Sequence, residues 1–433
     1  MLSSFTFENF KSYRKATLKL APLTVLIGAN ASGKSNAIEA LRLLCQIASG
    51  DKLAAIRHAL QDKEHAVRGN VSDLGFRGER AFSISCEITE PDWNRYSIGL
   101  ELRDDDELHI SNERVTGPAS NSPLFEVVSP SRGAPGDMFV AYNNFARGGK
   151  KPQIACSDQV TVLWQLTSPA RFYHDHKRSQ KEIPATTRRI HQQLSTVTLL
   201  DPRPSLMRDY SFKSEHNLTE SGKNLSGVLW NLCQKKDVRD QLLEFIRALP
   251  EQDIKEIDFI PTPRDEVMIR LTETFGGSST TYDATLLSDG TLRVLAIAAA
   301  ILSSAPGNLV VIEEVDNGVH PSRAAQLLTQ VSRIAKERDL RVLISSHNPA
   351  LLDALPDDAV PHVVFCYRDP SDGSSRLIRL SDIPDYPELI AQGTVGHLMT
   401  HRIMERFVKE RPEPGQRKIR AHAWLNELRK QVG

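Results

Sequence analysis

The sequence of 433 residues has few cysteines and no pattern among them. Its five cysteines stand at positions 45, 86, 156, 233 and 366, so no two of them form a C-x-x-C pair or another close spacing. A disulfide framework or a cysteine-based zinc site would need such pairs, and both are therefore excluded. We expect the five thiols to be reduced residues of a packed core.

The sequence also lacks a net charge and a long apolar run. It carries 54 lysines and arginines against 54 aspartates and glutamates, so no overall electrostatic field attracts nucleic acid or a membrane. Only a local charged patch could attract either of them. The longest apolar run, 294–302, is far too short to cross a bilayer. The N-terminus has no basic and apolar signal pattern. These absences predict a cytoplasmic protein with no membrane partner.

The patterns that are present predict an α/β fold with more than one lobe, because a chain of this length exceeds one ordinary core. Strand-like alternation at 2–7, 16–20 and in short runs between 81 and 128 predicts an antiparallel β-subdomain. The stretch 129–152, rich in Gly, Pro and Asn, is expected to be a long loop at a lobe boundary. Helices are predicted at 158–167, 186–195, 221–234 and 237–248, followed by two strands within 253–275, and no heptad run predicts a coiled-coil arm.

One stretch near the N-terminus has the pattern of a phosphate cradle. Gly28, Gly33, Lys34 and Ser35 satisfy G-x-x-x-x-G-K-[ST], with a buried strand before them and a helix after them. Small residues let backbone N–H groups turn toward phosphates, and the helix N-terminus adds partial positive charge. Lys34 is expected to reach the β- and γ-phosphates of a nucleoside triphosphate, and the Ser35 hydroxyl to bind Mg²⁺.

A second polar stretch, 286–293, also leads into a helix, predicted at 294–302. Ser288 offers a hydroxyl and Gly290 permits a close backbone approach, so this stretch is a second candidate anion site. The pattern alone is more typical of an ordinary helix cap.

A third stretch is an apolar strand, 308–312, that ends in two carboxylates. Side chains at the carboxyl end of a parallel strand lie beside the phosphate loop in sheets of this kind. We therefore predict that Glu313 binds Mg²⁺, directly or through water, and that Glu314 orients or deprotonates the attacking water. The alternative is a solvated acidic pair.

A fourth stretch, 341–346, is an apolar strand followed by His347. A histidine at this position can hydrogen-bond the γ-phosphate and report its presence. A lone histidine after a strand would otherwise be structural.

In this order the motifs resemble those of ABC-class ATPases, in the soluble branch with the RecF and SMC proteins. The resemblance implies an ABC-type P-loop core, with a mixed sheet and an antiparallel β-subdomain, plus a mainly helical lobe. It identifies 28–35 with the Walker A loop, 287–291 with the signature, 309–314 with Walker B and His347 with the switch histidine. It also places Asn317 to His320 at the D-loop. By the same resemblance the ATP-binding residues are Lys11, Asn30, Gly33, Lys34, Ser35, Asn36, Ser288 and Gly290.

The sequence departs from that family at three points. Glu313 stands where transport ATPases have Asp, and Val315-Asp316 stands where the nearest relatives usually have Pro-Glu. The Q-loop glutamine has no secure position, since Gln61 and Gln165 are both candidates. The geometry of the metal site is therefore expected to differ slightly.

The resemblance further implies a head-to-tail homodimer, in which each signature covers ATP held by the other chain's Walker A loop. ATP would close the dimer and hydrolysis would open it. The expected divisions are a first core half at 1–128, a loop and helical insert at 129–252, a second core half at 253–395 and a basic helical tail at 396–433. The resemblance leaves an assembly larger than a dimer as an alternative.

A narrower resemblance is to the stand-alone ATPases of prokaryotic anti-phage defence, of the OLD-like and Septu-like kind without a TOPRIM nuclease domain. It implies control of a separately encoded effector, such as a nuclease, and no nuclease activity in this chain. The acids after His347 are expected to be solvated rather than catalytic: Asp369, Asp372, Asp382 and Asp385. The tail, with amphipathic stretches at 403–409 and 419–430, would either dock an effector or pack on its own core.

Two other functions compete with defence. One is a RecF-like repair protein that binds DNA directly under ATP control, and the other, a transporter motor, is disfavoured by the opening phrase at 8–13. A basic segment is the best local candidate for a DNA-facing surface: Arg171, Lys177, Arg178, Lys181, Arg188 and Arg189. Within it, His174 and His176 lack a third metal ligand and are expected to lie in an exposed loop.

Overall fold

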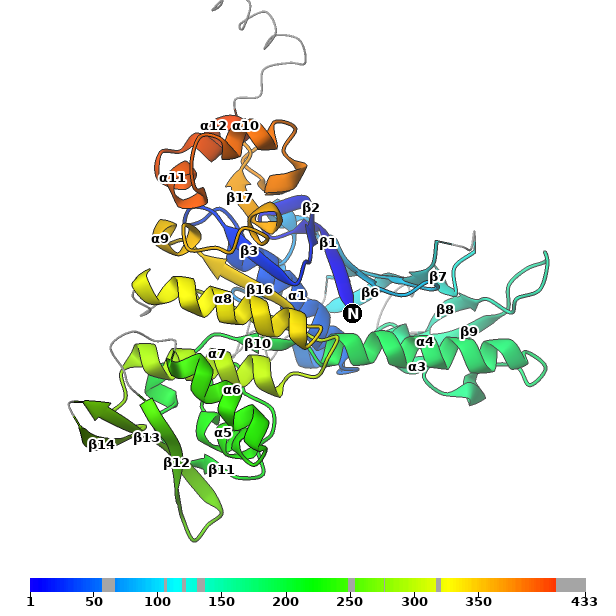
Figure 1. The fold of residues 1–433 in the computed structure, drawn as a ribbon. Coiled ribbons are helices and arrows are strands. Elements are labelled where there is room, and N and C mark those ends of the chain that lie inside the picture. The colour runs from blue at the N-terminus through cyan, green and yellow to red at the C-terminus, as the bar shows by residue number, and fades with distance from the viewer. Residues whose placement is uncertain are drawn as a thin grey trace, which may run out of the picture.

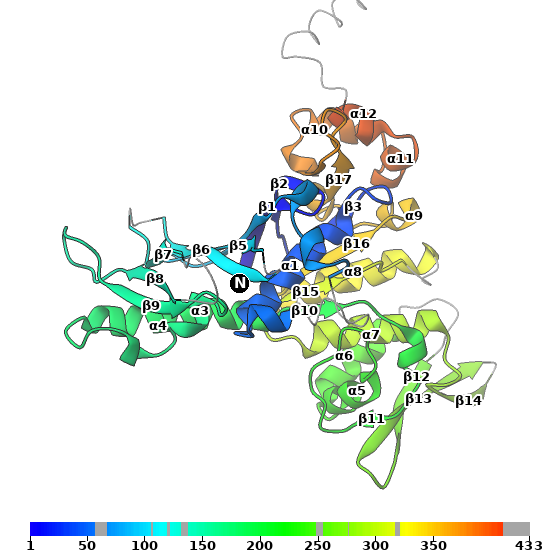
Figure 2. The ribbon, with the colours of Figure 1, turned by 180° about the vertical axis from the view of Figure 1, so that it is seen from behind.

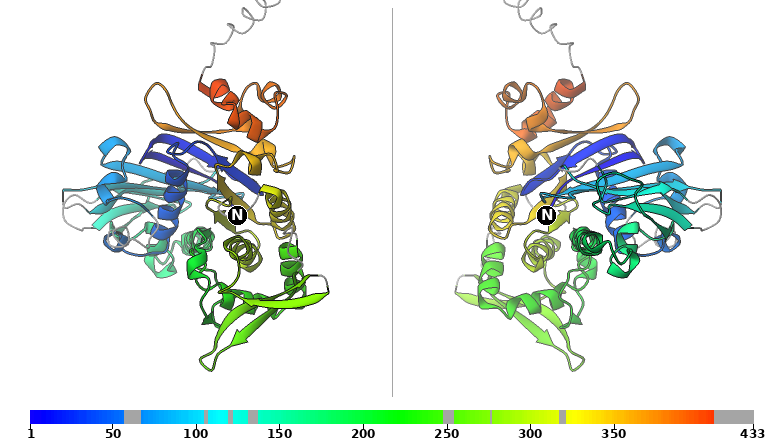
Figure 3. Two further views of the ribbon diagram at one scale, coloured as in Figure 1. Left: turned by 90° about the vertical axis from the view of Figure 1, so that its left-hand side faces the viewer. Right: turned by 90° about the vertical axis from the view of Figure 1, so that its right-hand side faces the viewer.

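The fold is built on a central parallel sheet that carries two lobes and a group of C-terminal helices. The computed structural model describes residues 1–56, 67–104, 107–118, 122–130, 137–247, 254–275, 277–316 and 321–409. Figure 1 shows the C-terminal helices at the top, an arm of β-strands at the right and a smaller lobe at the lower left. Figure 3 shows the C-terminal helices and the smaller lobe at opposite ends of the molecule.

The central sheet has six strands in the order β10-β15-β16-β3-β17-β18. Neighbouring strands run parallel except for the last pair, β17 and β18. Their bounds are β3 Leu23–Ile27, β10 Thr198–Leu200, β15 Leu309–Ile312, β16 Arg341–Ser346, β17 Val364–Arg368 and β18 Ser375–Arg379. The carboxyl ends of β3, β15 and β16 therefore meet at one edge, where the candidate motifs begin.

The alternation of side chains along these strands separates two hydrophobic cores. Val25, Val310 and Ile344 face one core, whereas Leu26 and Val311 face the other. Helices α5 to α9 contribute to the first core, and α1, α3 and α4 to the second. The continuous apolar runs predicted as buried strands are explained by this covering of both faces.

The second sheet is antiparallel and has eight strands in the order β2-β1-β4-β5-β6-β7-β8-β9. Their bounds are β1 Leu2–Phe10, β2 Tyr13–Lys19, β4 Ala81–Ile88, β5 Arg95–Leu102, β6 Leu108–Thr116, β7 Phe125–Ser129, β8 Asp137–Tyr142 and β9 Gln153–Ser157. The predicted antiparallel β-subdomain is confirmed.

The predicted loop at 129–152 is wrong over residues 137–142, which form β8. This strand pairs with β7 on one side and β9 on the other, so its backbone groups are satisfied within a continuous sheet. The Gly- and Asn-rich composition that suggested a loop belongs to the segments on either side of β8. Composition failed here because strand pairing with distant residues decided the structure.

Helices α1, Lys34–Ala48, and α4, Lys177–Ser195, pack against each other, and Figure 2 shows α4 beside strands β8 and β9. Between β9 and α4 lies the short α3, Val162–Gln165, where a helix over 158–167 was predicted. The helix predicted at 186–195 begins earlier, at Lys177, and continues through the buried Pro184. Proline predicts a break, but tertiary packing of the amphipathic face overrides that preference.

We call the next group of elements the second lobe. It comprises β11 Ser211–Phe212, α5 Leu225–Cys233, α6 Lys236–Arg247, β12 Ile254–Pro261, β13 Glu266–Phe275, β14 Ser278–Asp283 and α7 Asp289–Ser303. The predictions of two helices and two strands are confirmed. Strand β14 escaped prediction because its serines and threonines are largely exposed and show no apolar alternation.

The described residues after α7 contain five α-helices besides strands β15 to β18. The helices are α8 Pro321–Glu337, α9 Pro349–Leu352, α10 Tyr386–Ile390, α11 Val395–Thr400 and α12 Ile403–Lys409. The amphipathic stretch 403–409 buries Ile403, Met404 and Val408 in the chain's own core, and the stretch 419–430 lies outside the described residues. In the part of the chain that the structure describes, no helix has the length and apolarity to span a bilayer.

Candidate nucleotide-binding site

The glycine-bounded loop lies between the buried strand β3 and the start of α1, as predicted. Gly28 has a φ of 150°, and a Cβ there would lie 2.2 Å from the carbonyl oxygen of Cys366. Gly33 has a φ of 117°, and its Cβ would lie 2.4 Å from the Oγ of Ser375. Glycine is therefore required at both positions for two reasons, the backbone conformation and the close approach of the β17–β18 hairpin.

Lys34 lies against this loop. Its Nζ donates to the carbonyl oxygens of Gly28, at 2.7 Å, and Ala29, at 3.1 Å. Burial lowers the pKa of Lys34, and the negative charges of Glu314 and Asp316 oppose that shift. The acids after β15 thus lie close enough to Lys34 to act on its charge.

The first turn of α1 is tied to the turn between β1 and β2. Asn36 Nδ2 donates to the Ser12 Oγ at 2.8 Å, and the Ser375 Oγ lies 2.8 Å from the Ser12 Oγ and donates to the Ser32 carbonyl at 2.6 Å. Asn30 is exposed at the crest of the loop. These contacts hold the loop open toward the N-terminus of α1.

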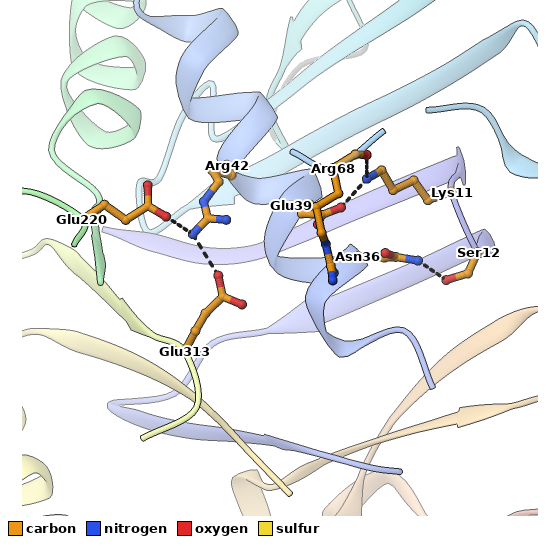
Figure 4. Close-up of polar contacts among 8 residues, drawn as sticks. All are labelled: Lys11, Ser12, Asn36, Glu39, Arg42, Arg68, Glu220 and Glu313. Atoms are coloured by element: carbon orange, nitrogen blue, oxygen red, sulfur yellow. Dashed lines mark hydrogen bonds and ion pairs between the residues drawn. The ribbon is translucent and has the colours of Figure 1, made fainter. Parts of the chain in front are cut away.

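Lys11 lies beside this turn, but its ammonium group is engaged by protein atoms. Figure 4 shows it directed at Glu39 of α1 and at the carbonyl of Arg68, to which it donates at 2.7 Å. Lys11 and Asn36 line one cavity of about 540 Å³, together with Arg68 and Phe76. The cavity has the size of a small-molecule site. A role for Lys11 at the nucleotide stays a prediction.

Glu313 follows the last residue of β15 and contacts α1 at Arg42. Its Oε1 accepts from Arg42 Nη2 at 2.8 Å, and the same nitrogen contacts Glu220 (Figure 4). Burial raises the pKa of Glu313, and the Arg42 guanidinium opposes that rise. Arg42 was not predicted, because its partners lie far from it in the sequence.

The donors at this position fit Mg²⁺, which prefers hard oxygen ligands. Ser35 lies two turns before Arg42 on the same face of α1, about 10 Å along the helix axis at 1.5 Å per residue. Because Glu313 contacts Arg42, the joint binding of one Mg²⁺ by the Ser35 hydroxyl and the Glu313 carboxylate stays a prediction. Asp316 adds a buried carboxylate whose Oδ1 has no hydrogen-bond partner among the described residues. A bound cation or its water would satisfy that oxygen.

Glu314 occupies a turn between β15 and the neighbouring strand end. Its φ is 46°, an unusual value for a residue with a Cβ, and such backbone often marks functional sites. Its N–H donates to the Ser345 Oγ at 3.0 Å, which fixes the turn to the end of β16. Ser345 was not predicted as a site residue.

His347 follows β16 and lies next to Asp316. The Nδ1 of His347 is 3.7 Å from the Asp316 Oδ2, and the imidazole is 44% exposed while Asp316 is buried. The structure therefore brings the predicted switch histidine to the same edge as Glu314 and Lys34. The segment 317–320, predicted as the D-loop, lies outside the described residues.

The predicted signature residues lie in the second lobe rather than beside the loop at Lys34. Ser288 caps α7 and accepts from the N–H of Thr291 at 3.1 Å, which confirms the capping interpretation. Helix α7 begins at Asp289, and not at 294 as predicted, so Gly290 lies in its first turn. Helix α7 packs on α5 and α6 (Figure 1).

Gln165, one of the two candidates for the Q-loop glutamine, holds the local backbone. Its Nε2 donates to the carbonyls of Ser157 and Val160, and its Oε1 accepts from the N–H of Ser157. Gln61 lies outside the described residues.

One acid near the site was not predicted. Asp201 follows β10 and acts on Glu313 as a nearby like charge. The apolar run 197–200 before Asp201 was the signal that could have indicated it.

The basic segment lies along α4 and is partly used within the chain. Arg178 pairs with Glu182 at 3.2 Å and Arg189 with Glu90 at 3.1 Å. His176 precedes α4 and its Nδ1 lies 2.7 Å from the Tyr142 hydroxyl. Within the described ranges, no group of three His, Cys, Asp or Glu side chains is arranged to hold a metal ion.

Replacement of Arg42 with methionine should destabilise the fold. The change leaves the half-buried carboxylate of Glu313 next to Asp201 and Glu220 without the cation that offsets it. Breaking a buried pair costs about 3 kcal/mol. Arg95→Met breaks an exposed pair with Glu87 and should cost less than about 1 kcal/mol. Denaturant unfolding measures both, and equal losses of the free energy of unfolding would contradict the assignment of Arg42.

Several solved structures of SMC head domains are similar to this chain. An SMC head bound to the C-terminal winged-helix domain of ScpA is 14% identical, with a TM-score of 0.46, over 87% of this chain and 96% of that chain. The SMC head domain from Thermotoga maritima is 14% identical, with a TM-score of 0.42, over 87% and 98% of the two chains. The SMC head from Pyrococcus furiosus, with an extended coiled coil and bound to the C-terminal domain of ScpA, is 12% identical, with a TM-score of 0.44, over 90% and 99%.

The family assignment comes from the sequence. No curated protein matches the chain. Residues 23–353 match the family described as "AAA domain, putative AbiEii toxin, Type IV TA system", and this span begins at β3 and ends just after α9. The chain belongs to this family, and it is an AAA-type P-loop ATPase.

Proposed function

We propose that the chain hydrolyses ATP at a site completed by a second copy, and that this ATP-gated dimer controls a separately encoded effector in anti-phage defence. The observation that supports the proposal is the separation of two phosphate-type segments in one chain. The loop at Gly28 to Ser35 belongs to the central sheet, whereas Ser288 starts α7 in the second lobe. A head-to-tail pair of copies would bring one of each to a single ATP.

The chemistry of the site follows from the residues in place. Lys34 and the N-terminus of α1 would hold the β- and γ-phosphates, and Mg²⁺ bound by Ser35 and Glu313 would neutralise their developing charge. Glu314 would orient and deprotonate the attacking water, while His347 would donate to the γ-phosphate. A loop that holds the phosphates from one side leaves the γ-phosphate exposed, so a second helix N-terminus adds stabilisation where charge accumulates.

The surface around Ser288 supports a docking role for the second lobe. Leu286 is 68% exposed, and Leu206 and Tyr210 from the neighbouring segment are 42% and 40% exposed. Exposed apolar residues gathered at one position are typical of protein interfaces. A second copy would cover them when ATP closes the dimer.

The proposed link to an effector rests on the family description, which names a toxin of a type IV toxin–antitoxin system. An ATP-driven change of assembly would provide a switch for such a partner protein. Isolation of the protein from its host should therefore recover a second protein with nuclease or other toxic activity, identified by mass spectrometry. Recovery of the chain alone, at every stage of phage infection, would contradict the effector proposal.

Direct DNA binding is the second candidate, and the exposed residues Lys177 and Lys181 on α4 favour it. If DNA binds there, double-stranded DNA should increase ATP turnover. This increase should fall steeply between about 50 and 200 mM salt, because phosphate contacts weaken over that range. Turnover that is the same with and without DNA at low salt would leave the effector proposal and remove the repair alternative.

A further inference from the structure

One arginine of the second lobe contacts four residues of the segment 284–289, three before Ser288 and one after it. Arg208 Nη1 donates to the carbonyl oxygens of Ala284 at 3.2 Å, Thr285 at 3.0 Å and Leu287 at 2.6 Å. Its Nη2 contacts the Asp289 Oδ1 at 2.5 Å. Arg208 lies outside the predicted motifs, about 80 residues before the segment that it contacts. No local turn could bring the two together.

These contacts determine the direction of the backbone at Ser288. In a trans peptide the C=O and the following N–H point in opposite directions. Because the Leu287 carbonyl points to Arg208, the N–H of Ser288 points away from it. The planar guanidinium suits this task, since it presents several donors in a fixed fork.

Arg208 also alters the charge at the start of α7. Asp289 is in the first turn of the helix, where a bound phosphate would meet its carboxylate, and this carboxylate is 65% exposed. Without a counter-ion, Asp289 would repel an anion at the helix N-terminus. The ion pair with Arg208 offsets that charge.

We propose that Arg208 is a positioning residue, which presents Ser288 and the exposed Leu286 to a second copy of the chain and neutralises Asp289 where the γ-phosphate of that copy would approach. This inference rests on the proposed function. It goes beyond it by assigning the geometry of the contact to one side chain that touches neither the nucleotide nor its own chain's phosphate loop.

The test uses the full chain with Glu314→Gln, which is expected to retain ATP. Arg208→Met in this background should weaken ATP-driven dimerisation at least tenfold, measured by analytical ultracentrifugation, whereas the affinity of the monomer for a fluorescent ATP analogue should change less than twofold. Arg208→Lys keeps a cation but lacks the second nitrogen that contacts Asp289 while the first contacts the carbonyls. It should weaken dimerisation at least threefold, and it serves as the milder variant if methionine impairs folding.

Arg239→Met is the matched control, because Arg239 lies in the same lobe, donates to the carbonyl of Ile257 at 2.7 Å and pairs with Glu256. It should leave dimerisation unchanged. Dimerisation of both Arg208 variants at the strength of the control would overturn the inference. Failure of Glu314→Gln itself to dimerise with ATP would instead refute the proposed function, so the two failures are distinct.

Discussion

Glu314→Gln should slow steady-state ATP hydrolysis by about 10²- to 10⁴-fold, the contribution typical of a positioned general base. Glutamine keeps the shape of the side chain but cannot accept the proton of the attacking water. ATP should still bind through Lys34 and the N-terminus of α1. If hydrolysis opens the dimer, the variant should accumulate as an ATP-bound dimer, which light scattering coupled to size exclusion detects.

The matched control for this variant is Glu337→Gln. Glu337 is half exposed on α8 and forms an i,i+4 pair with Arg333, a contact of little energetic value. Its turnover and assembly should equal those of the unaltered chain. A Glu314→Gln protein that hydrolyses ATP at the normal rate would show that another group activates the water.

Lys34→Met should abolish tight ATP binding. The loop lysine supplies charge-assisted hydrogen bonds to two phosphates, each worth about 1.5 to 3 kcal/mol, so the dissociation constant should rise by about 100-fold or more. The free energy of unfolding should change little, because methionine removes both the cost of burying the ammonium group and its hydrogen bonds to the carbonyls of Gly28 and Ala29. Isothermal titration with ATP and denaturant unfolding measure the two quantities.

Lys19→Met provides the comparison, since Lys19 is exposed and pairs with Asp382. ATP affinity should be unchanged in this variant. If Lys34→Met bound ATP as tightly as Lys19→Met, the glycine-bounded loop would not be the phosphate site.

The sequence predicted the site best where local pattern and chemistry coincide. Glu313, Glu314 and His347 follow apolar strands, and the structure places those strands side by side in one parallel sheet. The loop at Gly28 was predictable because its glycines, lysine and serine occupy fixed spacings. The structure adds that these glycines also yield space to the β17–β18 hairpin, which no local pattern contains.

The residues that escaped prediction act across long separations in the chain. Arg42 meets Glu220 and Glu313, and Ser345 fixes the backbone of Glu314. Arg208 meets carbonyls of the segment before α7. Each is an ordinary polar residue in its local sequence, so only the folded arrangement reveals its partners.

The errors in secondary structure have the same origin. Strand β8 was hidden in a loop-like composition, and α4 continues through Pro184 against its local preference. In both cases packing or strand pairing with distant residues outweighed intrinsic propensity. In contrast, the conformation of residues 28–35 depends on glycines within that segment, at Gly28 and Gly33.

The central claim is that ATP is enclosed by two copies of the chain, and the structure of the Glu314→Gln protein with Mg²⁺ and ATP tests it most directly. The claim predicts a two-fold dimer in which the Ser288 hydroxyl of one copy lies within hydrogen-bonding distance of the γ-phosphate held by Lys34 of the other. ATP bound at Lys34 with Ser288 directed to solvent, in every assembly found, would contradict it.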